Sequence, residues 1–485
     1  MEQTTAPGIA HQTESARGAL EDQNDQLKAV HGRYSLSFAI FLIMGICIGS
    51  GIFFKTDNIL IATGGDVFLG ALMFVIAATY IVFGGLTLSL YASRTAGAGG
   101  ILNYASRFVS DGFGRFMGYF YTFVYMPAIS AVIFWVAGVY ACQALGLAAT
   151  LENQMLIGLV CLIACCVLNV LSPIIAGKFQ DMSTILKIVP LLTVGAIGMW
   201  LTITDSANTA GAISSAGAAA GAQTAGAAGA QSWAWLAAAA PVAYSFDGWP
   251  IATSIAPELK NSKRNLPIAL VVAPLLILFL YLAYFVGISI TLGPGEVMAS
   301  GDESLGLFFA HTLGEGARTL PVVIAFLAIF GVGNGVTLGY TRMPQALAIE
   351  GKLPHASWLA QTDERFKSPL HSGLVALVCT LVWMAIHYVT QKSGFFVNGD
   401  VSEVTISLGM LFMVPILLSA LVLRVHEGAS VFLSVVAPIL ACIPCLLVVT
   451  SGLVSSTQQL VLSLICAAVV LVWGIKHAWD LCHAE

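Results

Sequence analysis

Long apolar runs, separated by short polar or glycine-rich stretches, fill the chain from residue 36 to residue 475. Each run is close to the roughly 20 residues that a membrane-crossing helix needs, and none alternates as a barrel strand does. Because a segment in lipid must satisfy its own backbone hydrogen bonds, the runs predict an all-α polytopic membrane protein. The twelve predicted spans are 36–54, 67–91, 115–141, 154–172, 182–203, 233–256, 267–290, 320–345, 370–390, 403–423, 429–450 and 458–475.

The composition agrees with this pattern and excludes other classes of protein. Of the 485 residues, 58% are hydrophobic and 9% are charged, whereas soluble domains average about 25% charged residues. An ordinary soluble enzyme, a nucleic-acid-binding protein and a disordered scaffold are therefore excluded. Most of the ten cysteines lie in apolar runs, so they suggest neither a disulfide framework nor a zinc motif. We expect no metal, no cofactor and no nucleic-acid partner.

Lysine and arginine residues fall mainly on one side of the predicted spans. Sixteen lie on the side of the N-terminus, and three lie on the other side, at Lys55, Arg318 and Lys392. Because basic loops stay cytoplasmic, we expect a multi-pass protein of the plasma or inner membrane with both termini in the cytoplasm. The first 30 residues contain no apolar signal-peptide core, so no cleaved signal is expected.

Two predicted spans contain residues that disfavour a continuous helix at matching depth. The first span contains three glycines within Gly45–Gly51, and the sixth contains Gly248–Pro250. In a helix interior glycine costs about 1 kcal/mol and proline about 3 kcal/mol. Close packing of helices through small residues is the alternative explanation for Gly45 and Gly49.

The two interrupted spans are five spans apart, so they run in opposite directions through the membrane. Helices 1–5 and 6–10 are therefore expected to be inverted copies, and matched interruptions in two halves indicate a transporter site at the midplane. Broken helices expose free N–H groups on one side and free C=O groups on the other. Such a pair suits a zwitterion, and an α-amino acid is one.

Several motifs resemble a known family. Gly49–Phe53 is similar to the first-helix signature of amino acid–polyamine–organocation permeases, and Tyr244–Trp249 with Pro257–Asn261 resembles their L-type amino acid transporter branch. The resemblance implies a LeuT-like 5+5 inverted repeat with broken helices 1 and 6 and two additional helices. This sequence departs from the family pattern at Tyr91–Arg94 and at Pro250.

The resemblance also implies roles for residues at the two interruptions. Backbone groups at Ser50 and Gly51 would hold the substrate carboxylate, and carbonyl groups near Cys47 and Ser245 would hold its amino group. The candidate substrate-binding residues are Cys47, Ile48, Gly49, Ser50, Gly51, Tyr244, Ser245, Phe246, Asp247, Gly248, Trp249 and Asn334.

The expected organisation follows from the repeat. It comprises a cytoplasmic tail (1–35), a first repeat (36–203), an outer loop (204–232), a second repeat (233–424), and helices 11 and 12 with a short cytoplasmic tail (425–485). The Ala/Gly-rich stretch 205–232 favours a flexible loop, with an Ala/Gly helix as the alternative.

Two ionisable residues within spans are functional candidates because charge in a membrane is costly. The family resemblance implies that Lys187, in helix 5, stands near helices 1 and 8, where sodium-driven relatives bind sodium, so it is predicted to replace that ion or to carry a proton; snorkelling to the surface is the alternative. Asp247 is predicted either to contact a cationic or hydroxylated substrate side chain or to cap the following half-helix. Asn334 either joins the site or bonds between helices.

Further polar residues are assigned to the ends of spans. His311 and His387 are expected to be solvated near outer ends, and Glu258 is expected to join gate salt bridges or a surface charge cluster. In the L-type branch that this chain resembles, animal members attach a glycoprotein through an outer cysteine between helices 3 and 4; Cys142 lies near that region, but we expect no accessory subunit.

The predicted function is sodium-independent exchange of neutral or broad-range amino acids by alternating access across the lipid bilayer. A proton-coupled symporter and an antiporter of cationic amino acids or polyamines are the alternatives. A membrane enzyme is disfavoured, because the chain has no His-Glu-x-x-His motif and no phosphate-binding loop. A channel is disfavoured because the predicted pseudo-symmetry lies within one chain.

Overall fold

The computed structural model describes residues 32–49, 51–54, 56–95, 97–204, 242, 245–395 and 400–455. The N-terminal tail to residue 31, the Ala/Gly-rich stretch 205–232, most of the first half of span 233–256 and the predicted span 458–475 lie outside these residues. Within them the fold is helical, and one isolated parallel bridge joins Tyr34 and Leu259.

Nine helices within the described residues are long and apolar enough to cross a membrane. They coincide with predicted spans 2–5 and 7–11, which confirms a polytopic helical protein. The nine are Val67–Ala92, Asp111–Leu145, Leu151–Leu171, Pro173–Thr204, Ser262–Leu292, Glu315–Ile349, Leu370–Lys392, Val401–Glu427 and Phe432–Val449.

The individual elements subdivide these helices. The α-helices are α2 (Leu36–Cys47), α3 (Gly51–Phe54), α4 (Thr56–Ala62), α5 (Val67–Ala92), α6 (Ile101–Tyr104), α7 (Asp111–Phe120), α8 (Met126–Leu145), α9 (Leu151–Leu171), α10 (Pro173–Thr204), α13 (Ser262–Leu292), α14 (Pro294–Ser300), α15 (Ser304–Leu313), α16 (Leu320–Tyr340), α17 (Met343–Ile349), α18 (Ala356–Leu359), α19 (Leu370–Lys392), α20 (Val401–Leu418), α21 (Ala420–Glu427) and α22 (Ala437–Ser455). The π-helical turns are η1 (Ala105–Val109), η2 (Tyr121–Tyr125) and η7 (Phe432–Val436), and the 3₁₀ segments are η4 (Trp249–Glu258), η5 (Gly301–Glu303) and η6 (Glu315–Ala317).

Polar caps set several helix starts. Ser35, Asp66 and Ser110 each accept a hydrogen bond from a backbone N–H in the first turn of α2, α5 and α7. The cap at Ser110 starts its helix four residues before the predicted span, and α10 starts at Pro173 rather than at 182. Polar residues of this added segment, such as Gln180, are buried inside α10.

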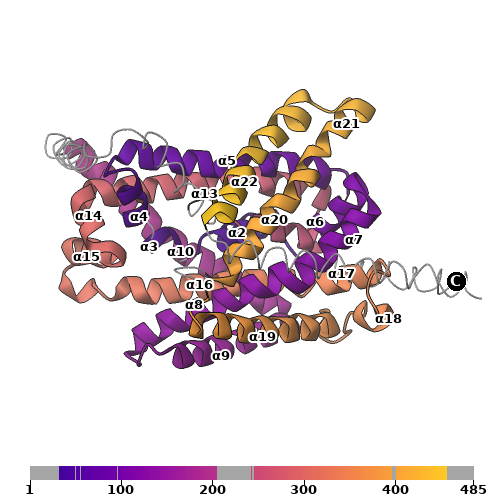
Figure 1. Cartoon of the computed structure of the whole chain (residues 1–485), viewed down its shortest axis with the longest axis horizontal. Helices are drawn as coiled ribbons and strands as arrows, with labels where there is room; N and C mark the ends of the chain where they lie inside the picture. Colours follow the sequence, from indigo (N-terminus) through magenta and orange to yellow (C-terminus); the bar gives the residue numbers. More distant parts are fainter. Residues whose placement is uncertain are drawn as a thin grey trace, which may run out of the picture.

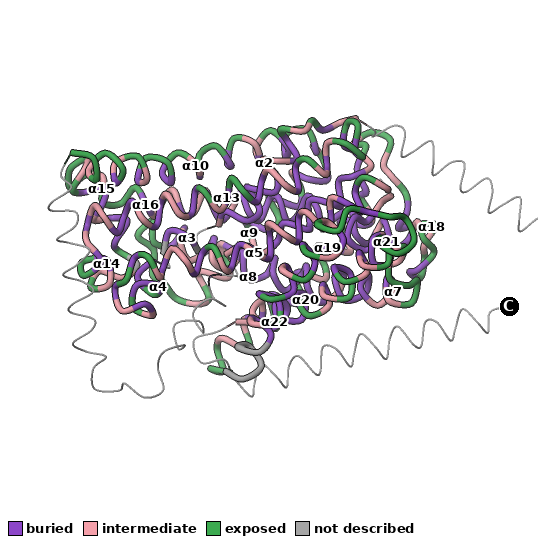
Figure 2. Tube along the Cα trace, turned by 90° about the horizontal axis from the view of Figure 1, so that it is seen from above, coloured by how far each residue is buried: buried purple, intermediate pink, exposed green. Residues whose placement is uncertain are grey.

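Most of the long helices run side by side along the long axis of the molecule, whereas α20 and α22 cross them obliquely (Figure 1). Short helices α4, α14 and α15 gather at one end, and α6, α7, α17 and α18 gather at the other, which we call the basic end because it carries Arg342 and Lys352. Helix α2 packs against α10, α13 and α16 in the interior. Figure 2 shows buried residues along the centre of the bundle and exposed residues along its outside, notably on α10.

Candidate functional site

Helix α2 stops midway through the bundle at Cys47. The N–H of Ile48 still donates to Met44 O (2.8 Å), but the N–H of Gly49 turns to Cys47 O (2.9 Å) instead of continuing the helical pattern. A new helix, α3, begins at Gly51. The predicted break in the first span is therefore present, and the last turn of α2 has carbonyl groups available for other donors.

A second irregular segment lies between Ser245 and Gly248. Ser245 and Phe246 form a turn, and the chain then enters the 3₁₀ segment η4 at Trp249. Gly248 has a φ of +88°, a conformation that favours glycine, and a Cβ there would lie 2.7 Å from a methyl carbon of Ile46. Pro250 fits the first turn of η4 because that position needs no N–H donor.

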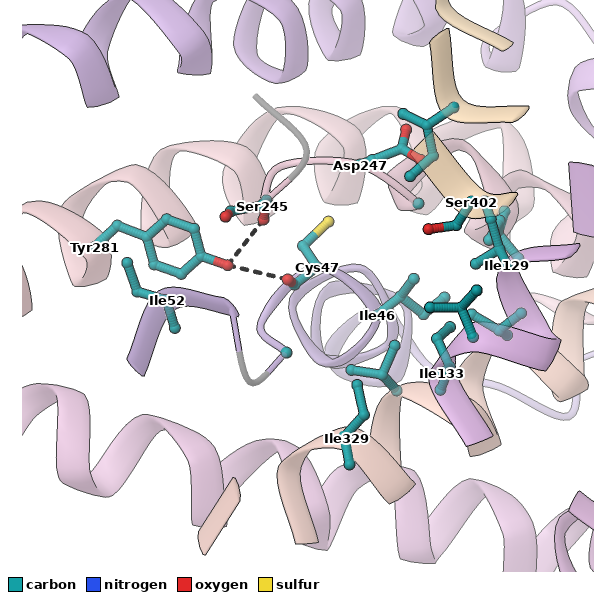
Figure 3. A pocket seen from close by; sticks show the side chains of 17 residues that line it. Ile46, Cys47, Ile52, Ile129, Ile133, Ser245, Asp247, Tyr281, Ile329 and Ser402 are labelled. Carbon is teal, nitrogen blue, oxygen red and sulfur yellow. Dashed lines mark hydrogen bonds between the residues drawn. The ribbon is translucent and has the colours of Figure 1, made fainter. Parts of the chain in front are cut away.

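Two side chains from neighbouring helices satisfy carbonyl groups at these breaks. The hydroxyl of Tyr281 on α13 lies 3.0 Å from Cys47 O and 3.0 Å from Ser245 O, so it bridges the two segments (Figure 3). The ammonium group of Lys187 on α10 donates to Gly45 O at 2.7 Å. A cation at this position also matches the negative end of the α2 helix dipole.

A cavity of about 180 Å³ opens beside the two breaks. Its walls are mainly isoleucine and valine, and its polar groups come from Cys47, Ser245, Asp247, Tyr281 and Ser402 (Figure 3). A mostly apolar hollow with a few converging polar groups is typical of a small-molecule site. The lining residues are Ile46, Cys47, Gly49, Ile52, Ile129, Val132, Ile133, Ser245, Asp247, Gly248, Ile251, Tyr281, Ile329, Val332, Val336, Ser402 and Ile406.

Asp247 faces this cavity and accepts a hydrogen bond from the hydroxyl of Tyr125 at 2.6 Å. Tyr125 ends the π-helical turn η2, and such turns redirect side chains within a helix. Two other side chains satisfy the carbonyl groups of this turn: Tyr340 donates to Thr122 O and Trp383 donates to Phe123 O.

The predicted binding residues divide into three groups. Those that line the cavity are Cys47, Gly49, Ser245, Asp247 and Gly248. Those that are described but absent from the lining are Ile48, Phe246, Trp249 and Asn334; for Gly51 the structure describes only the backbone, which begins α3. Ser50 and Tyr244 lie outside the described residues.

Phe246 and Trp249 are buried against other aromatic rings. Phe246 packs on Tyr281, with ring centroids 5.0 Å apart, and Trp249 packs edge-on against Tyr80 at 5.7 Å. Both side chains are fully buried. They support the wall of the site from behind, and neither is among the described residues that line the cavity.

Asn334 takes part in a buried bond network between helices. Its amide nitrogen donates to Gln180 Oε1 (2.9 Å) and Ala176 O (3.1 Å), and its oxygen accepts from Asn169 (3.0 Å). The interhelical alternative for Asn334 is therefore the arrangement observed.

Three expectations for polar residues are corrected or refined by burial. Lys187 is only 1% exposed and points at α2, so it does not snorkel to the surface. His387 was expected to be solvated, but it is fully buried and its ring lies 4.7 Å from that of Trp135. Cys142 is also fully buried, which removes its thiol from the surface.

Ion pairs connect three segments at the basic end. The carboxylate of Glu258 pairs with Arg342 and, at 3.1 Å, with Arg33, and all three side chains are largely buried. Beside them the N–H of Tyr34 donates to Glu258 O (3.0 Å), and the N–H of Lys260 donates to Tyr34 O (2.9 Å). The chain entering α2 is thus fastened to the chain leaving η4.

Tyr281, Tyr125 and Ser402 were missed by the sequence reasoning. Each lies in or beside an apolar run. There the two tyrosines cannot be told apart from tyrosines that lie at the membrane interface, and the serine has no motif around it. Among the described residues, no cluster of three or more His, Cys, Asp or Glu side chains could hold a metal ion.

Comparison with known proteins gives a consistent result. Residues 34–475 match the sequence profile of a family described as amino acid permease. The chain is 24% identical to the serine/threonine exchanger SteT of Bacillus subtilis (strain 168), covering 91% of this chain and 96% of that protein. It is 27% identical to human Asc-type amino acid transporter 1, covering 79% and 72% of the two chains, and 25% identical to human large neutral amino acids transporter small subunit 2, covering 73% and 64%.

Proposed function

Because this chain belongs to the amino acid permease family, we propose that it is a secondary active amino acid transporter that exchanges neutral or broad-range amino acids without sodium. SteT is named as an exchanger of serine and threonine, and the human relatives are named as amino acid transporters. These names support the substrate class, and the cavity beside the two breaks supports the place where it binds.

The convergence of two backbone breaks on one cavity carries this proposal. Cys47 O and Ser245 O, which come from different halves of the chain, lie within 3.0 Å of the same hydroxyl of Tyr281. An ammonium group of a substrate has the same donor character as that hydroxyl and would bind beside it at these carbonyl oxygens. Backbone groups at Ser50 and Gly51 would receive the substrate carboxylate.

The apolar part of the cavity would hold the substrate side chain. Val132, Ile329 and Ile406 favour aliphatic groups, whereas Asp247 and Ser402 give one wall polar character. With Tyr125 bound to its carboxylate, Asp247 is placed to select hydroxylated side chains over purely aliphatic ones. This combination favours small neutral amino acids.

Lys187 would replace a sodium ion between α2 and α16. Its ammonium group holds Gly45 O, and a Cβ on Gly331 of α16 would lie 3.1 Å from Lys187 Nζ. A fixed positive charge in this position gives Gly45 O a permanent cationic partner, whereas a sodium ion would bind and leave in each cycle. This arrangement favours sodium-independent exchange. If Lys187 instead loses its proton during the cycle, the same site supports proton-coupled symport.

The full architecture belongs to the same proposal. It comprises twelve membrane helices in a LeuT-like 5+5 inverted repeat, with the basic end and both termini in the cytoplasm. The pairs of Glu258 with Arg33 and Arg342 would close the cytoplasmic side in this conformation. Transport requires that they separate when the site opens inward.

Counterflow in proteoliposomes tests the function. Liposomes with purified protein are loaded with one unlabelled amino acid, and uptake of labelled neutral, cationic and acidic amino acids is measured with and without sodium and pH gradients. We expect saturable uptake that requires internal amino acid and ignores sodium. If empty liposomes under a proton gradient take up as much amino acid as loaded liposomes, the transport mode is proton-coupled symport and not exchange. Uptake that does not saturate would contradict a carrier.

A further inference from the structure

One face of α10 presents three buried polar side chains at successive helical turns. Gln180, Thr184 and Lys187 are spaced by four and three residues, so they lie on the same side of the helix. Their exposed fractions are 0%, 0% and 1%. This face packs against α2 on one side and α16 on the other. The proposed function uses only Lys187.

Thr184 has two acceptors for one hydroxyl proton. Its Oγ1 lies 3.1 Å from Phe41 O on α2 and 2.8 Å from Gln180 O on its own helix. Phe41 lies one turn before Gly45, whose carbonyl group accepts from Lys187. Helix α10 therefore binds two carbonyl groups of α2 at consecutive turns. On release the hydroxyl of Thr184 keeps Gln180 O as its acceptor, whereas Phe41 O loses the Thr184 donor.

Gln180 is fixed at one end of its amide and free at the other. Its Oε1 accepts from Asn334 on α16 at 2.9 Å, whereas its Nε2 has no partner among the described residues. The free Nε2 lies against the backbone of α2, because a Cβ added to Gly45 would overlap it. A buried amide N–H without a partner is unfavourable, so any movement that admits water or an acceptor to this group is favoured.

We propose that Thr184 and Gln180 are positioning residues that, with Lys187, form a releasable latch on the Phe41–Cys47 segment of α2. The proposal rests on the transport function proposed above, because release of α2 from α10 is what opening of the basic end requires. Neither Thr184 nor Gln180 lines the cavity, so neither touches the substrate. The latch sets the balance between closed and open basic ends.

The two residues have different effects on release. The Thr184–Phe41 bond stabilises the closed arrangement, and a typical net contribution of one hydrogen bond corresponds to about a fivefold change in an equilibrium. Gln180 Nε2 opposes the closed arrangement, because it is satisfied only when α2 moves away. Removing the hydroxyl of Thr184 should therefore favour opening, whereas removing the amide of Gln180 should favour closure.

Labelling of Cys47 from the basic end measures this balance without any substrate. Cys47 lines the cavity, and a membrane-impermeant thiol reagent trapped inside oriented proteoliposomes reaches it only when the basic end is open. Labelling of the Cys47→Ser protein measures the signal from the other cysteines, and this background is subtracted. We expect Thr184→Val to speed this labelling about fivefold at an unfolding temperature close to that of the parent protein. We expect Gln180→Met to slow the labelling; it also leaves Asn334 without one acceptor, so its unfolding temperature should fall.

Matched variants separate the latch from general effects on α10. Thr184→Ser keeps the hydroxyl and should restore the parent rate. Thr193→Val makes the same substitution on the same helix at a hydroxyl that donates only to Val189 O within that helix (2.9 Å), so it should leave labelling unchanged. Equal labelling rates in Thr184→Val and Thr193→Val would overturn the latch. Labelling shifts in a protein that exchanges no amino acid would instead support the latch and refute the transport proposal.

Discussion

The ammonium group of Lys187 lies 2.7 Å from the carbonyl oxygen of Gly45, at the turn where α2 loses its own hydrogen bonds. The break creates the acceptor, and a side chain from α10 supplies the donor. Because burying a cation in a membrane is costly, the site has to be stabilised by these dipoles. Removing Lys187 would therefore affect the break itself as well as the charge.

Replacing Lys187 by alanine should reduce exchange at least tenfold. The carbonyl group of Gly45 would lose its partner, and leaving such a buried group unpaired costs about 1–3 kcal/mol. Initial rates of counterflow in proteoliposomes measure the effect. Lys178→Ala is the matched control, because that lysine lies on the same helix with its side chain exposed. Normal exchange by Lys187→Ala would contradict a role for this amine.

Replacing Tyr281 by phenylalanine should raise the KM for amino acid and lower the rate by about tenfold. The ring stays in place against Phe74 and Phe246, but Cys47 O and Ser245 O both lose their shared donor. Loss of one hydrogen bond at a buried carbonyl group is worth about 1–3 kcal/mol. Tyr388→Phe removes a hydroxyl from a half-buried tyrosine of α19 that does not line the cavity and should leave transport unchanged. If the two variants behave alike, the bridge is not part of the site.

Replacing Asp247 by asparagine should change the order of preferred substrates. The cavity keeps its shape but loses a negative charge, so cationic or hydroxylated amino acids should lose affinity relative to aliphatic ones. Competition of a panel of amino acids against one labelled substrate gives this order. Asp66→Asn, at the start of α5, retains a side-chain cap and serves as the control. An unchanged order would leave Asp247 only a structural role beside Tyr125.

The apolar pattern of the sequence predicts where helices run, because hydrophobic length is a local property. It therefore locates nine of the long helices, and the glycines of Gly45–Gly51 predict the break after Cys47. The sequence left two explanations for these glycines, an interrupted helix and close packing of helices, and they apply to different residues. Gly45 stays helical and permits close packing, whereas Gly49 lies in the break.

The direction of side chains depends on helix rotation and neighbours, which local sequence does not fix. Trp249 follows the second break in sequence, yet it points at Tyr80 rather than into the cavity. Tyr281 comes from a distant helix, and no motif distinguishes it from other membrane tyrosines. His387 is buried because Trp135 of another helix covers it, although its position near the end of a span predicted solvation.

The buried ion pairs of Glu258 should contribute more to stability than the exposed pair of Glu303. Glu258→Gln leaves Arg33 and Arg342 facing a neutral amide, and breaking a buried pair costs about 3–5 kcal/mol. The pair of Glu303 with Arg318 has similar geometry, at 2.8 Å, but its side chains are 71% and 47% exposed. Glu303→Gln should therefore cost at most about 1 kcal/mol. Thermal unfolding in detergent compares the two variants, and equal shifts would refute a buried network at the basic end.

Replacing Gly45 by alanine should impair both folding and exchange, although alanine favours helices. Its Cβ would overlap Gln180 Nε2 and Thr184 Oγ1, so these two buried side chains or the helices themselves must shift. Overpacking of this kind costs about 1–3 kcal/mol, and it also displaces Gly45 O from Lys187. Gly112→Ala in α7 adds the same methyl group where no atom lies within 4 Å, so it should be neutral or slightly stabilising. Unfolding temperature and counterflow are measured for both. If Gly45→Ala is as active as Gly112→Ala, the close approach of α10 to α2 at Gly45 is not needed for transport. The polar face of α10 could then move away from α2 without loss of exchange.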